Sequence, residues 1–66
     1  MAEATHAYVG IYQGECKAVH VDLGDDHTVE FIAEVIRHGG HVERVPLDVA
    51  RTALFQPWPL AEQPSP

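Results

Sequence analysis

The sequence predicts a small α+β domain with the element order β-β-α-β-α. Residues 7–23 are rich in Val, Ile and Tyr and are interrupted at Gly14, which is typical of a β-hairpin. Residues 27–38 repeat apolar side chains at helical spacing, and a short apolar segment, 41–45, follows two glycines. We therefore expect a hairpin plus a third strand packed by one amphipathic helix, with a short C-terminal helix and a Pro-rich tail.

The chain has room for one domain. A protein of 66 residues buries only about 60% of the surface that its unfolded chain exposes. Cys16 is the only cysteine, so no internal disulfide can reinforce the core. We assign residues 1–56 to a single small domain and residues 57–66 to the Pro-rich C-terminal tail. We expect so small a core to gain stability from oligomerisation.

The apolar pattern of the hairpin, with strands at 7–12 and 16–23, indicates which side chains share a face. A two-residue loop would place Val9 and Val19 on opposite faces, whereas a three-residue loop, 13–15, pairs them. We therefore expect the three-residue loop. One face then carries Val9, Ile11, Val19, Val21 and Leu23. The other face carries Tyr8, Gly10, Tyr12, Cys16, Ala18 and His20.

The helix at 27–38 has recognisable ends. The preceding Gly24-Asp25-Asp26 offers an aspartate as N-cap, and Gly39-Gly40 ends the helix. Its apolar arc consists of Val29, Ile32, Ala33, Val35 and Ile36, with Phe31 at the edge. Pro46 ends the third strand and opens a shorter helix near 47–55. The sequence does not decide whether the third strand lies beside the first or the second.

The charge balance argues against several classes of partner. Ten acidic and four basic residues give a net charge of −6, which disfavours direct binding to nucleic acid or to an anionic membrane surface. No apolar segment approaches the roughly 20 residues that span a bilayer, and the N-terminus has no signal-peptide pattern. We therefore expect a cytoplasmic protein.

No combination of residues matches a catalytic or cofactor site. A pair formed by Cys16 and His20 would lack a third, orienting group, and we expect Cys16 to be a small apolar residue. We expect no enzymatic activity, no metal and no cofactor. Five histidines leave one alternative, a metal-binding module that uses His38 and His41 with another histidine, although no motif with metal-ligand spacing is present.

The outer face of the hairpin is the main candidate for a binding surface. It is apolar, whereas the solvated side of an antiparallel sheet is usually polar. We therefore expect a protein-interaction or regulatory accessory module, a homodimer or a binder of another protein. The expected contact residues are Tyr8, Tyr12, Ala18, His20 and Trp58. Trp58 would either anchor the partner or fold back over this face.

An acidic row supports a second alternative. On a helix, Asp26, Glu30 and Glu34 would follow one another at intervals of about 6 Å. Such a row resembles a phosphate backbone, so the chain could be an acidic inhibitor that mimics nucleic acid on a basic partner surface. The same row is also explained by a solvated helix face whose first acidic residue suits the helix N-terminus.

Overall fold

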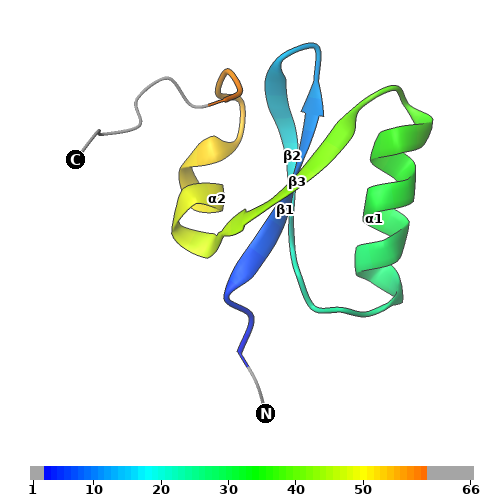
Figure 1. The fold of residues 1–66 in the computed structure, drawn as a ribbon, viewed down its shortest axis with the longest axis vertical. Helices are drawn as coiled ribbons and strands as arrows, with labels where there is room; N and C mark the ends of the chain where they lie inside the picture. Colours follow the sequence, from blue (N-terminus) through cyan, green and yellow to red (C-terminus); the bar gives the residue numbers. More distant parts are fainter. Residues whose placement is uncertain (1–2, 60–66) are drawn as a thin grey trace.

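A computed structural model describes residues 3–59 of the chain. The elements are β1 (His6–Tyr12), β2 (Glu15–Val21), α1 (Asp26–Arg37), β3 (His41–Pro46) and α2 (Leu47–Ala53) (Figure 1). The predicted α+β class and the β-β-α-β-α order are confirmed. Residues 60–66 of the expected Pro-rich tail lie outside the described residues. Within residues 3–59, neither helix is long and apolar enough to cross a membrane.

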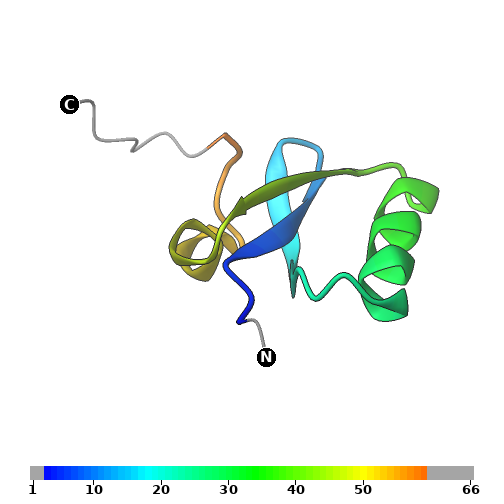
Figure 2. The same ribbon diagram turned by 60° about the horizontal axis from the view of Figure 1, so that its bottom comes forward.

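The three strands form one antiparallel sheet in the order β2-β1-β3. The third strand therefore joins beside the first, which the sequence left undecided. The two helices lie on opposite sides of this sheet, α1 on one face and α2 on the other (Figures 1 and 2). The sequence placed only the amphipathic helix on the sheet, whereas the structure has one helix on each face. Strand β1 lies between β2 and β3 within the sheet and between α1 and α2 across it.

The main core lies between the sheet and α2. Its buried members are Ala7, Val9, Ile11, Cys16, Val45, Ala50 and Ala53, with Val19, Leu47, Val49 and Trp58 partly buried against them. The two small residues of α2, Ala50 and Ala53, are both buried, so this short helix meets the sheet through alanines. Of the residues that the sequence grouped on one face, Val9, Ile11 and Val19 therefore pack against α2 and not against α1, whereas Val21 and Leu23 are exposed.

The hairpin turn contains two residues, and the predicted three-residue loop is wrong. Tyr12 pairs directly with Glu15. Between them, Gln13 and Gly14 have φ values of 53° and 78°, and positive φ at both central positions is what a type I′ turn requires.

A β-bulge restores the face pattern that the three-residue loop was expected to provide. The register shifts between two neighbouring residues of β1, which leaves Lys17 of β2 as the extra residue. Beyond the bulge, Val9 pairs with Val19, as predicted. On the turn side, Ile11 pairs with Cys16. The Cys16 side chain therefore belongs to the α2 core and not, as predicted, to the opposite face.

A hydrogen-bond network around Thr28 fixes the start of α1. The backbone N–H and the hydroxyl of Thr28 both donate to the Asp25 carboxylate, each over 3.1 Å. Thr28 Oγ1 also accepts from the backbone N–H of Leu23 and lies 3.3 Å from Nε2 of His20 in β2. The backbone hydrogen bond from Thr28 is the main reason why the pKa of Asp25 is lowered. The predicted N-cap thus also ties the helix to the sheet.

Two glycines allow α1 to approach the sheet closely. Val35 is only 2% exposed, and a Cβ placed on Gly10 would lie 2.9 Å from its Cγ2 atom. A Cβ on Gly40 would lie 2.9 Å from Cγ1 of Val35 and 2.6 Å from the carbonyl oxygen of Ile11. Because Val35 contacts both positions, α1 lies over the junction between β1 and the start of β3.

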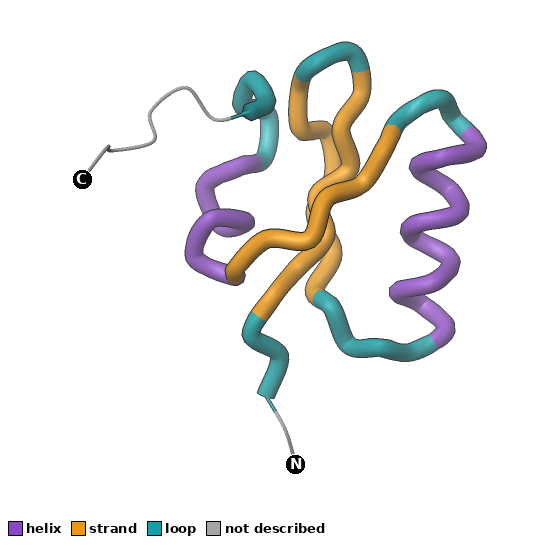
Figure 3. The backbone as a smooth tube through the Cα atoms, viewed as in Figure 1, coloured by secondary structure: helices purple, strands orange, loops and turns teal. Residues whose placement is uncertain are grey.

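The chain after α2 continues along the outer edge of β2 (Figure 3). The Phe55 N–H donates to the Cys16 carbonyl over 2.7 Å, and the Cys16 N–H donates to Gln56 over 2.9 Å. The Trp58 N–H donates to the Gly14 carbonyl over 2.7 Å. These contacts continue past residue 56, where the domain was expected to end. Trp58 packs against the α2 core and not over the face that carries Tyr8.

The adjacent glycines at the end of α1 should respond differently to the same substitution. We expect Gly40→Asn to lower the free energy of unfolding by roughly 1–3 kcal/mol, because its Cβ would collide with backbone and with Val35. Gly39→Asn should cost much less, because Gly39 has an open surrounding and a φ of 88° that Asn tolerates. Urea unfolding followed by circular dichroism measures both, and equal losses would contradict the close approach.

The Asp25 cap should give stability a specific pH dependence. Because the folded-state pKa of Asp25 is lowered, its contribution is fully present above its unfolded pKa of roughly 4. It is lost as the pH falls through the lower folded-state pKa. Asp25→Asn retains an N-cap acceptor without this titration. The stability difference between wild type and this variant should therefore shrink below about pH 4 in urea titrations, whereas a pH-independent difference would argue against the carboxylate cap.

Candidate functional site

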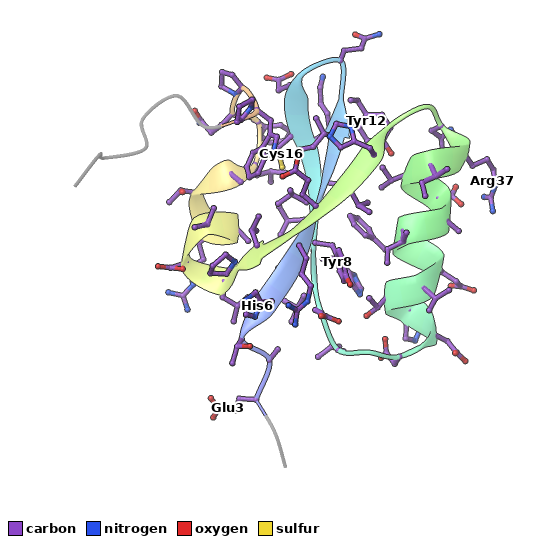
Figure 4. The ribbon with its side chains drawn as sticks, in the orientation of Figure 1. Glu3, His6, Tyr8, Tyr12, Cys16 and Arg37 are labelled. Carbon is purple, nitrogen blue, oxygen red and sulfur yellow. The ribbon has the colours of Figure 1, made fainter. Side chains whose placement is uncertain are left out.

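Helix α1 covers the face of the hairpin that the sequence assigned to a partner. Tyr8, Tyr12, Ala18 and His20 are all half-buried, and Figure 4 places Tyr8 on the α1 side of the sheet. The His20 ring stacks on Phe31 of α1, with ring centroids 5.2 Å apart. The expectation that this face points away from the amphipathic helix is therefore wrong.

Two small residues on this face, Gly10 and Ala18, pair with each other and leave a shallow dip. It is filled from within the chain, since Val35 of α1 lies against Gly10. Trp58 is half-buried against the core on the opposite side of the sheet. The five residues expected to contact a partner are thus divided between two faces, and they do not form one surface.

One exposed apolar surface lies on α1; other exposed large apolar residues are Val21, Leu23, Leu54 and Phe55. The predicted inward arc is only partly buried: Val35 is enclosed, whereas Val29 and Ile36 are 63% and 59% exposed and Ala33 is also exposed. Val29, Ile32 and Ile36 follow helical spacing, so they share one side of α1. We call these three residues the α1 stripe. The side chains of α1 that contact the sheet are instead Thr28, Phe31 and Val35. The close approach at Gly10 and Gly40 brings only this narrow line of residues against the sheet.

The α1 stripe faces the β3 side of the sheet. On the β2 side, His20 meets Phe31 and Thr28. At helical spacing, the stripe lies on the opposite side of Val35 from Phe31. Because β1 lies between β2 and β3, that is the β3 side. Val42 of β3 pairs with Gly10 and is half-buried on the same face of the sheet. The stripe and Val42 thus lie on the same face of the sheet, both on its β3 side.

Strand β3 presents an open edge beside this stripe. It pairs with β1 on one side, and in the described part of the chain no other segment pairs with its outer side. The outer edge of β2 differs, because residues 55–58 bond to it near the turn and Lys17 forms a bulge. Such coverings and bulges protect an edge from further pairing, and an uncovered edge is a template for another strand. We call the α1 stripe together with the outer edge of β3 the α1–β3 surface.

The acidic row lies on exposed positions of α1 but is not uniformly negative. Asp26, Glu30 and Glu34 are all exposed. Glu34 forms an ion pair with Arg37 and lies 3.1 Å from Nε2 of His38. The hydrogen bond with His38 and the charge of Arg37 lower the pKa of Glu34. The charge of Arg37 partly neutralises the C-terminal end of the row. A shallow hollow on this side is lined by His20, His27, Glu30, Phe31, Ala33, Glu34 and Arg37.

The two histidines named in the metal alternative are directed to different carboxylates. His38 contacts Glu34, and Nε2 of His41 lies 3.6 Å from Oε2 of Glu43. Across residues 3–59, no three side chains of the His, Cys, Asp and Glu types are placed to hold one metal ion. The geometry therefore adds no support for that alternative.

Cys16 and His20 lie on opposite faces of the sheet. Cys16 is fully buried in the α2 core, its Sγ donates to the Ala18 carbonyl over 3.5 Å, and burial is the main cause of its raised pKa. A raised pKa keeps the thiol protonated, and the thiolate is the reactive form. These two residues are therefore not placed as a nucleophile and its base.

The native protein should consequently protect its thiol. We expect Cys16 to react with an aromatic disulfide reagent at pH 8 roughly a hundredfold or more slowly in buffer than in concentrated urea. Ala33→Cys in a Cys16→Ala background provides an exposed control that should react rapidly in both conditions. Rapid reaction of native wild-type protein would contradict the burial of this thiol.

Known proteins offer no template for the α1–β3 surface: no family model matches the chain, and no curated protein or solved structure is significantly similar to it. Its interpretation therefore depends on the chain's own residues. The feature that most favours a binding surface is the exposure of the α1 stripe beside the open edge of β3.

Proposed function

We propose that this chain is a non-enzymatic protein-interaction module, a regulatory or accessory protein that binds its partner through the α1–β3 surface. The observation that carries the proposal is the exposure of Val29 and Ile36 directly beside an unpaired strand edge. Scattered exposed apolar residues are ordinary on a soluble protein. Here, the exposed Val29 and Ile36 share one helix side with the half-buried Ile32, and this side of α1 faces an edge strand. Partners use apolar helix faces and strand edges in recognition.

The energetics of α1 support a partner on this surface. The only apolar side chain of α1 that its own domain buries is Val35. Full burial of a side chain such as Val or Ile stabilises by about 1.5–3 kcal/mol. A partner that encloses Val29 and Ile36 would therefore add a contribution comparable to a large part of a small domain's stability.

The charge distribution favours the same surface. With a net charge of −6, most approaches would bring acidic groups of two such chains together. Asp26, Glu30 and Glu34 follow one another at helical spacing and lie away from the α1 stripe, so contact through the stripe leaves them in solvent. The buried free thiol of Cys16 is compatible with a reducing compartment such as the cytoplasm, where we propose the protein acts.

Substitution of the stripe tests the proposed function. We expect Ile36→Lys to weaken association at least tenfold, because a charge would replace an apolar contact. Phe55→Lys is the matched control, since Phe55 is 65% exposed but follows α2 on the other side of the sheet. A chain labelled at its N-terminus is followed by sedimentation velocity, alone and in cell lysate. If wild type sediments as a monomer in both, or if both variants behave alike, the proposal fails.

A further inference from the structure

We infer that the α1–β3 surface binds a second copy of this chain, with the two β3 strands paired antiparallel about a twofold axis at Val42; this rests on the proposed function. Four features define this arrangement: the symmetry of edge pairing, the charges of β3, the position of Pro46 and the lateral position of α1 over the sheet. Each restricts the arrangement independently.

Symmetry restricts the possible registers. A twofold axis that relates two antiparallel edge strands stands perpendicular to the sheet, so α1 of both copies lies on the same face. Paired residues must then have side chains on the same face, and the axis passes through a single residue of β3. The interior residues are Val42, Glu43, Arg44 and Val45. An axis at Val45 would pair Arg44 with Pro46, which has no N–H for a ladder, so the candidates are Val42, Glu43 and Arg44.

Charge favours the axis at Val42. An axis at Glu43 places this carboxylate directly opposite itself, and an axis at Arg44 does the same with two guanidinium groups. Like charges directly opposite destabilise a strand pair. An axis at Val42 instead creates two symmetric pairs, in each of which His41 of one copy lies opposite Glu43 of the other. These two side chains are exposed and already lie 3.6 Å apart within one chain, so they can exchange partners across the axis.

Arg44 is also turned away from the edge. Its Nε donates to Oδ2 of Asp22 over 2.8 Å. Asp22 follows β2, and Arg44 pairs with Tyr8 of the central strand, so the guanidinium reaches across β1. An axis at Val42 leaves this ion pair intact and out of the interface.

Pro46 excludes the register centred at Arg44 on separate grounds. Proline has no N–H to donate to a strand ladder. With the axis at Arg44, Pro46 would face Val42 of the second copy, and with the axis at Glu43 it would face Gly40. With the axis at Val42, Pro46 lies opposite residue 38 of the second copy, which precedes the strand. Pro46 therefore excludes the register centred at Arg44, whereas Gly40 also precedes the strand, so the register centred at Glu43 is disfavoured by charge alone.

The position of α1 allows the two helices to meet. Val35 contacts both Gly10 of β1 and Gly40 before β3, so the helix lies about half a strand spacing inward from β3. Strands lie about 4.8 Å apart, which puts the two α1 helices about two spacings, or roughly 10 Å, apart. Packed helices are typically separated by 8–10 Å. The helices would run antiparallel, with Val29, Ile32 and Ile36 of each facing the same residues of the other.

Cysteine substitution tests the register. In a Cys16→Ala background, Val42→Cys, Glu43→Cys and Arg44→Cys each place a thiol on the twofold axis of one register only. Directly opposed residues have Cα atoms about 4.5–5.5 Å apart, within disulfide range. We expect Val42→Cys to form a covalent dimer under mild oxidation at least tenfold faster than the other two, on a non-reducing gel. Faster linkage of Glu43→Cys or Arg44→Cys would overturn the register.

Charge exchange tests the same axis without new thiols. We expect Glu43→Lys to raise the dimer dissociation constant roughly tenfold, because it places Lys opposite His41 at two sites. Combining it with His41→Glu should restore the wild-type value. If purified wild-type chain stays monomeric but a lysate still yields a complex that Ile36→Lys weakens, the partner is not a second copy of the chain. The proposed function is then retained. A dimer that is indifferent to Ile36 overturns both.

Discussion

The contact of Val35 with Gly10 and Gly40 determines how α1 lies on this protein. Because these positions lack a Cβ, the valine reaches the backbone of the sheet and draws the helix onto the junction of β1 and β3. The helix is held along one line of residues, from Thr28 through Phe31 to Val35. A helix held along one line cannot bury a broad apolar arc, so Val29 and Ile36 stay exposed.

Alternation along the strands was sufficient to predict the fold class and the grouping of side chains on each face. The pairing of Val9 with Val19 followed from the requirement for a shared apolar face, although the chain satisfies it with a bulge at Lys17 and not with a longer turn. An extra residue in the turn and an extra residue in a bulge shift the later strand pairs by the same amount. Both therefore place the same side chains on each face beyond the bulge. Sequence reasoning therefore predicted the pairing correctly and misplaced the insertion, and with it Cys16.

The assignment of helices to faces could not be derived from sequence patterns alone. Both faces of the hairpin are apolar, and helical periodicity shows that α1 has an apolar arc without showing how much of it the narrow sheet can cover. The dip at Gly10 and Ala18 was interpreted as a binding surface, whereas it receives Val35. The path of Trp58 likewise depends on long-range backbone bonds to the β2 turn, which no local pattern indicates.

The segment that follows α2 has a consequence for the size of any assembly. By bonding to Gly14 and Cys16 it occupies the turn end of one rim of the sheet, and the bulge at Lys17 interrupts that rim directly beside it. A protein with two free rims can add subunits indefinitely and grow into a fibre. A protein with a single free rim can pair with only one further copy and stops at a dimer. The C-terminal segment therefore makes growth through sheet pairing self-limiting.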